Sequence, residues 1–115
     1  MKTFALCAML LLFAVNGMAK SQISNVKIVK IQTYKDYAAV RYEPARSNGE
    51  NCSNAELREN VFIVKYTDSS HADNMHATAL SALHAGKTIG LGLDGCNSWG
   101  GGVPKAYRID IFADQ

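Results

Sequence analysis

The first nineteen residues determine how much of this chain is left to fold. Lys2 is followed by an unbroken apolar run from Phe4 to Val15, and Gly17-Met18-Ala19 supplies the small residues of a cleavage site. This layout is typical of a secretory signal peptide, and the run is shorter than the roughly 20 apolar residues of a membrane-spanning helix. A short membrane anchor or a buried N-terminal helix is the alternative. We expect a signal peptide over residues 1–19, cleavage after Ala19, and a secreted or periplasmic domain over residues 20–115.

Two cysteines remain in that domain, because Cys7 belongs to the expected signal peptide. Cys52 and Cys96 can pair in only one way, and exported proteins fold in an oxidising compartment, so we predict a Cys52–Cys96 disulfide. Closing a loop of this length stabilises a small domain by about 4 kcal/mol in the loop-entropy model. A metal-binding or redox pair is the alternative, but the two cysteines lack C-x-x-C spacing. The sequence predicts no cofactor and no metal site.

The charge pattern argues against a nucleic-acid partner. The chain carries 12 Lys and Arg against 10 Asp and Glu, a net charge of +2, and loss of Lys2 with the signal peptide leaves 11 against 10. Positive residues are interspersed with negative ones, whereas polyanion-binding proteins gather them in a basic patch. No second apolar run is long enough to cross a membrane after cleavage.

Five segments have the β-branched, alternating composition of strands. In the first, Val26 and Ile28 share one face while Val29 and Ile31 share the other, and this change of face predicts a bulge or strong coiling. In the second, Tyr42 falls on the face that we expect to line the core. The expected strands cover residues 25–33, 37–42, 61–67, 88–94 and 105–112.

One helix is expected, over His71–Ala85. Ser70 is a suitable N-cap, Asp73 three residues on completes a capping-box spacing, and Gly86 suits the C-terminal end. Its apolar face is formed by Ala72, Met75, Ala79, Leu80 and Leu83. The resulting order, β-β-β-α-β-β with one disulfide, predicts a mainly β protein with the five-stranded barrel of an OB-fold. An open antiparallel sheet with a helix packed on it is the alternative.

The C-terminal half resembles a known family. It contains NMHATALSALHAGKTIGLGLDGC followed by PKAYRIDIF, with Ala85-Gly86-Lys87 at the helix end, Gly95-Cys96 at a strand end and Pro104-Lys105 opening the last strand. These features resemble small exported proteins of the subtilase cytotoxin B-subunit-like family and, more distantly, the OB-fold B subunits of AB-type bacterial toxins. The resemblance implies an OB-fold that forms a ring, binds cell-surface glycans and carries a separate enzymatic subunit. The shared features belong to the scaffold, so the resemblance assigns no binding residue.

Catalytic signals are weak, and we expect a binding protein rather than an enzyme. Both cysteines of the domain are expected to be paired, no G-x-S-x-G elbow is present, and the glycines at 100–102 lack the pattern of a phosphate-binding loop. The histidines at 71, 76 and 84 form no i, i+4 metal grip, and His76 is expected to be a partly buried, hydrogen-bonded structural residue. A small extracytoplasmic hydrolase using Asp94, Asp110 or a histidine is the alternative.

The strongest candidate for ligand binding is Trp99, the single tryptophan of the chain. It lies in a glycine-rich loop, and loops carry binding residues disproportionately. An indole can stack on a sugar face, and Asn97 can supply hydrogen bonds beside it, so we predict a glycan site at Trp99 and Asn97. Alternatively, Trp99 covers the disulfide and plugs one end of the barrel. A third function is a domain that binds or inhibits a protein partner.

A homo-oligomer is also expected, with slight support from the sequence. Alternation in the last strand places Tyr107, Ile109 and Ile111 on one face, so Phe112 points outward if Ile111 points inward. Gly90 and Gly92 would then leave the neighbouring strand bare enough for a second copy to approach.

Overall fold

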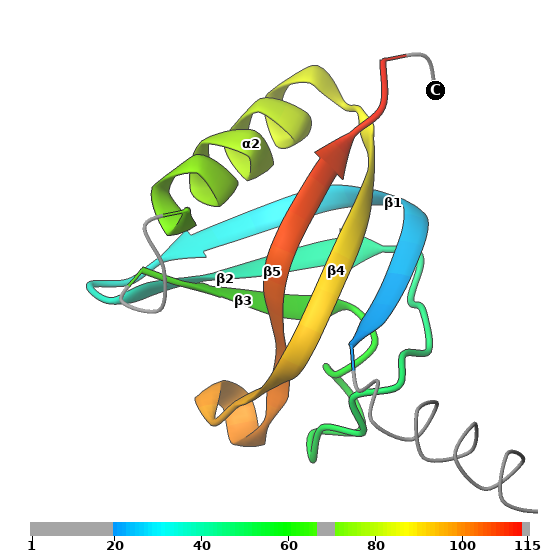
Figure 1. The fold of residues 1–115 in the computed structure, drawn as a ribbon, viewed down its shortest axis with the longest axis vertical. Coiled ribbons are helices and arrows are strands. Elements are labelled where there is room, and N and C mark those ends of the chain that lie inside the picture. The colour runs from blue at the N-terminus through cyan, green and yellow to red at the C-terminus, as the bar shows by residue number, and fades with distance from the viewer. Residues whose placement is uncertain (1–19, 67–70, 114–115) are drawn as a thin grey trace, which may run out of the picture.

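The computed structural model describes residues 20–66 and 71–113 (Figure 1). The predicted signal peptide and the predicted N-cap Ser70 lie outside these residues. The six main elements follow the predicted order: β1 (Ser21–Thr33), β2 (Tyr37–Glu43), β3 (Val61–Lys65), α2 (Ala72–Ala85), β4 (Thr88–Asn97) and β5 (Val103–Ile111). A short 3₁₀ turn, η1 (Trp99–Gly101), lies between β4 and β5.

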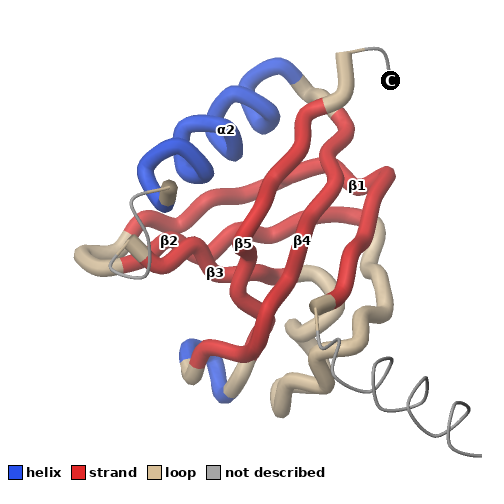
Figure 2. The backbone as a smooth tube through the Cα atoms, viewed as in Figure 1, coloured by secondary structure: helices blue, strands red, loops and turns tan. Residues whose placement is uncertain are grey.

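The five strands form a closed barrel in the order β1-β2-β3-β5-β4. Every pairing is antiparallel except that of β3 with β5, which are parallel and meet at Ile63 and Lys105. The helix α2 connects β3 to β4 and lies beside one end of the barrel, while the β4–β5 connection lies at the opposite end (Figures 1 and 2). The OB-fold-like architecture predicted from the order of elements is therefore confirmed, and the open sheet is excluded.

The predicted bulge in β1 is present and has a clear effect on side-chain direction. The pairing with β2 shifts register between Ile28 and Lys30, so Val29 is the extra residue and is 43% exposed. Beyond the bulge, Ile31 packs against the same interior cluster as Val26 and Ile28. A second irregularity lies between Ile23 and Val26, which allows one long strand to pair with both β2 and β4.

The interior of the barrel is filled by apolar side chains from all five strands and α2. Tyr42 is fully buried there, as predicted, together with Val26, Val40, Phe62, Val64, Ile89, Leu91 and Leu93. The helix contributes mainly small residues, Ala72, Ala79 and Ala82, so its axis can approach the strands closely. Leu80 was expected on this face but is 47% exposed, because it follows Ala79 by one residue and is rotated about 100° around the helix.

The outer face of β4 is not bare, which corrects the expectation for Gly90 and Gly92. β5 shifts register opposite Gly92, so Tyr107 becomes an extra residue and its ring turns onto Gly92 instead of sharing the face of Ile109. A Cβ atom on Gly92 would lie only 2.6 Å from that ring. Phe112 covers Gly90 in the same way, at 3.4 Å from the position of a Cβ atom. The chain's own aromatic side chains therefore occupy the surface expected to receive a second copy.

The predicted disulfide is confirmed and lies close to a second connection between distant segments. Cys52 and Cys96 are bonded, with their Cα atoms 5.7 Å apart. The carboxylate of Glu50 accepts hydrogen bonds from the Ser21 hydroxyl and from the Gly95 N–H, the latter at 2.7 Å. The loop before β3 is thereby fastened to the start of β1 and to the end of β4.

Candidate ligand-binding site on the outer face of the barrel

A second apolar cluster lies outside the barrel, on the outer face of β2 and β3. Its buried members are Ala39, Val61, Ile63 and Val103, and it is partly covered by Tyr37, Leu57 and Trp99. Because successive residues of a strand point to opposite faces, β3 contributes Phe62 and Val64 to the interior and Val61 and Ile63 to this outer cluster. A strand that is apolar on both faces needs cover on the outside as well as the inside.

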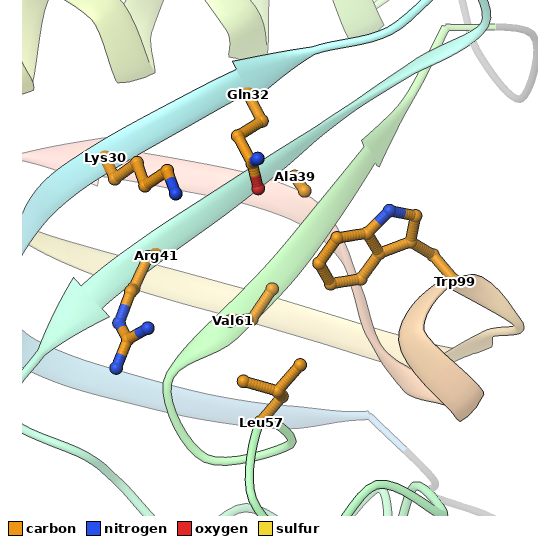
Figure 3. Close-up of a pocket in the computed structure, with 7 residues that line it drawn as sticks. All are labelled: Lys30, Gln32, Ala39, Arg41, Leu57, Val61 and Trp99. Atoms are coloured by element: carbon orange, nitrogen blue, oxygen red, sulfur yellow. The ribbon is translucent and has the colours of Figure 1, made fainter.

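The cover is incomplete and leaves a pocket of about 200 Å³ (Figure 3). Its base is apolar, with Trp99 on one side and Lys30 and Arg41 on the opposite side. The complete lining consists of Lys30, Gln32, Ala39, Arg41, Leu57, Val61 and Trp99. An aromatic wall, an apolar base and two cations suit a ligand that has both an apolar face and polar groups at its edge.

The two cations are direct neighbours across the β1–β2 pair. The register pairs Lys30 with Arg41, and both residues are exposed. Neither forms an ion pair with any residue that the structure describes. Like charges directly opposite one another destabilise a sheet, so this pair has an energetic cost that an anionic group between them would relieve.

Trp99 is held by hydrogen bonds within its own loop. Its backbone N–H donates to the side-chain oxygen of Asn97 at 2.9 Å, and its backbone carbonyl accepts from the Gly102 N–H at 3.1 Å. Gly102 has a φ of +125° and comes so close to Ser53 that a Cβ atom would lie 3.0 Å from its backbone nitrogen. Glycine is therefore required where the loop rejoins β5.

The structure places the two predicted binding residues differently. Trp99 lines the pocket and covers the outer cluster, so it does not plug an end of the barrel. Asn97 is not part of the lining, and its side-chain oxygen is engaged by the Trp99 N–H. Asn97 therefore holds the backbone of Trp99, and direct contact between Asn97 and a ligand stays a prediction.

Asn54 connects the two loops that border the pocket, although no sequence motif marks this residue. Its side-chain nitrogen donates to the carbonyl of Gly100, beside Trp99. Its side-chain oxygen accepts from the N–H groups of Glu56 and Leu57, both at 3.0 Å. A single amide thus fixes Leu57 and the Trp99 loop relative to each other.

The carboxylates considered for catalysis are not brought together. Asp110 pairs with Gly90, four positions before Asp94 on β4, which corresponds to about 13 Å along the strand. Paired carboxylates of glycoside hydrolases share one site with about 5–9.5 Å between their carboxyl groups, whereas neither Asp94 nor Asp110 lines the pocket. Asp110 instead forms an ion pair with Arg108 at 3.1 Å.

The histidines also remain apart from the pocket. His76 is partly buried against the ring of Tyr66, with 5.5 Å between ring centroids, and its Nε2 has no hydrogen-bond partner among the described residues. His84 lies exposed in the last turn of α2. Within residues 20–66 and 71–113, no group of three or more His, Cys, Asp or Glu side chains is arranged to hold a metal ion.

Comparison of the chain with protein-family models, with curated proteins and with solved structures gives no match. None of the helices in the described part of the chain has the length and apolar character needed to cross a membrane.

Proposed function

We propose that this protein is an exported, non-enzymatic binding module that holds a glycan in the pocket beside Trp99. The observation that carries the proposal is the pocket itself: an indole wall, an apolar base and two adjacent cations on one surface. OB-folds bind oligosaccharides and oligonucleotides on the face of strands 2 and 3, between the loops that follow strands 1 and 4. The pocket lies on that face and is bordered by the β4–β5 connection.

The lining favours a sugar that carries an acidic group. The C–H face of a pyranose ring can stack on the Trp99 indole, and Gln32 offers both a donor and an acceptor to hydroxyl groups. A carboxylate or sulfate on the sugar would lie between Lys30 and Arg41 and relieve their repulsion. The proposed ligand is therefore an anionic sugar.

A glycan fits this chain better than a nucleic acid does. Single-stranded nucleic acids are also bound by aromatic and basic residues on OB-folds, but along a positively charged groove. Here the excess of positive residues is two for the whole chain, and the pocket contains two cations. The predicted export and the resemblance to toxin B subunits also support a glycan.

The test is a glycan array of neutral, carboxylated and sulfated sugars, probed with wild type and Trp99→Ala. Wild type should bind acidic sugars, and Trp99→Ala should lose about tenfold in affinity, a loss within the range measured when an aromatic residue that stacks on a nucleic-acid base is removed. Leu80→Ala is the matched control, because Leu80 is an exposed apolar residue on α2 and should be without effect. Turnover of a sugar without array binding would favour the hydrolase alternative.

Charge substitutions separate the two parts of the proposed site. Lys30→Gln and Arg41→Gln should weaken binding of acidic sugars more than binding of neutral ones. Lys27→Gln changes the net charge equally but lies outside the pocket, so it should not alter this preference. Equal losses for acidic and neutral sugars would contradict an anionic ligand.

Export and assembly belong to the same proposal. N-terminal sequencing of the exported protein should begin at Lys20, directly before β1. The homo-oligomer stays a prediction, and light scattering at micromolar concentration tests it. A strictly monomeric mass would remove the multivalency by which several weak glycan sites act together.

A further inference from the structure

The pocket is one end of a longer row of side chains on the outer surface of β1 and β2. Lys30 and Gln32 of β1 line the pocket, and Tyr34, the first residue after β1, continues the same alternation and donates its backbone N–H to the Tyr37 carbonyl. On the paired strand, Arg41, Ala39 and Tyr37 follow in the opposite direction. We call this set the β1–β2 platform: Lys30, Gln32 and Tyr34 with Arg41, Ala39 and Tyr37.

The far end of the platform is aromatic. Tyr34 stacks on Tyr37 with 4.8 Å between ring centroids and 23° between ring planes. Trp99 lies 6.4 Å from Tyr34, at an interplanar angle of 58°. Tyr37 packs into the outer cluster and stacks on Tyr34, yet Tyr34 is still 38% exposed, so part of its ring remains open to solvent.

The platform is too long for one sugar ring. Lys30 and Tyr34 are four positions apart, which is about 13 Å in an extended strand. Tyr34 lies next to Trp99 but is not part of the pocket lining, so a ring held in the pocket leaves the exposed part of Tyr34 available to a second ring. We infer that Tyr34 forms a second subsite, and that the protein binds a linear glycan of at least two rings with its acidic ring at the Lys30–Arg41 end and its next ring stacked on Tyr34. This inference rests on the proposed function and adds chain length and direction to it.

The test uses uronic acids and sulfated hexosamines, each printed as mono-, di- and tetrasaccharide on the same linker. Wild type should bind the tetrasaccharide about tenfold more tightly than the monosaccharide, as expected for one additional stacked ring. Tyr34→Ala should remove that gain and leave monosaccharide binding within about twofold of wild type. Trp99→Ala should weaken binding at every length.

Two control variants distinguish stacking from other effects. Tyr34→Phe keeps the ring and should keep the length dependence. Tyr107→Ala removes a tyrosine of similar exposure, 36%, from the outer face of β5, and should leave glycan affinity unchanged at every length. Melting temperatures of all variants show whether the fold is retained.

The results that overturn the inference are distinct from those that overturn the proposed function. Equal losses at every length in Tyr34→Ala would mean that Tyr34 only positions Trp99, and no loss at any length would mean that the second subsite does not exist. Tighter binding of a thymidine oligonucleotide than of any tetrasaccharide would replace the glycan with a nucleic acid. Failure of wild type to bind any acidic sugar would overturn the proposed function, and the second subsite with it.

Discussion

The two apolar clusters of this domain differ in how completely they are closed. The interior cluster draws on every strand and on α2, and its largest members are fully buried. The outer cluster has four buried residues, relies on loop residues for cover, and opens into the pocket beside two adjacent cations. The interior cluster is enclosed by strands and α2, whereas the outer cluster is covered in part by Trp99 and Leu57, which lie in the connections between strands.

This difference indicates that the interior cluster mainly stabilises the fold, whereas the outer cluster mainly provides the proposed binding surface. A closed interior contributes stability through burial and close packing. A partly covered apolar surface beside two adjacent cations contributes less stability and commonly marks an interaction site. We therefore expect substitutions in the interior to lower stability with little direct effect on ligand affinity. Substitutions of the partly buried residues that cover the outer cluster, Trp99 and Leu57, should lower ligand affinity with a smaller loss of stability.

The largest expected effect comes from the disulfide. Replacing both cysteines, Cys52→Ala with Cys96→Ala, should lower the free energy of unfolding by about 4 kcal/mol, because the unfolded chain regains the entropy of an open loop. Urea denaturation of wild type, reduced wild type and the double variant measures this loss. A decrease below about 1 kcal/mol would show that Glu50 and the barrel hold this end without the disulfide.

The next effect compares the two clusters directly. Leu91→Ala in the interior should lower the free energy of unfolding by about 3 kcal/mol, because a large buried side chain leaves a cavity. Trp99→Ala should cost no more than about 1.5 kcal/mol, because the indole is only partly buried. Denaturation curves and glycan affinities of both variants are required. A larger loss of stability for Trp99→Ala than for Leu91→Ala would show that the outer cluster, and not the interior, contributes more to stability.

The smallest effect concerns a polar atom in the interior. The Tyr42 hydroxyl is buried without a hydrogen-bond partner among the described residues, so Tyr42→Phe should raise the free energy of unfolding by about 1 kcal/mol. Burial, with the nearby Glu59 carboxylate as a second cause, raises the pKa of Tyr42 above its ordinary value. As the pH rises, the Tyr42 hydroxyl therefore ionises at a lower pH in the unfolded chain than in the folded protein.

This pKa shift makes the difference in free energy of unfolding between wild type and Tyr42→Phe depend on pH. The contribution of the neutral Tyr42 hydroxyl to the free energy of unfolding is fully present below about pH 10, the pKa of tyrosine in the unfolded chain. This contribution falls as the pH rises above that value. Burial also raises the pKa of Tyr66, which adds to the same trend. Tyr42→Phe should flatten the loss of stability between pH 9 and about 11, as measured by denaturation at fixed ionic strength. An unchanged slope would mean that Tyr42 is hydrated in the folded protein.

The fold was predictable because its signals are local. Strand alternation, the glycine after the helix and a single possible disulfide are visible in consecutive residues, and the order of elements then restricts the topology. The positions of Tyr107 and Lys30 were not predictable, because both depend on where a strand gains an extra residue relative to its partner. A one-residue change of register reverses the face of every later side chain.

The candidate site was only partly predictable for the same reason. Trp99 was identifiable as the single tryptophan in a glycine-rich loop. The Lys30–Arg41 pair required the register of the β1–β2 hairpin, and the bond from Asn54 to Gly100 joins residues 46 positions apart. Outward-facing Lys30 and Gln32 opposite Arg41 and Ala39 would have been the available signal once that register was known.

The most direct test of the proposed site is the intrinsic fluorescence of Trp99, since no other tryptophan contributes to the signal. Wild type is titrated with the acidic tetrasaccharide that binds best on the array, and acrylamide quenching is measured with and without it. A ligand stacked on the indole should shift the emission and reduce quenching, with the same affinity as the array gives. Binding on the array with unchanged emission and unchanged quenching would place the ligand elsewhere and contradict the proposed site.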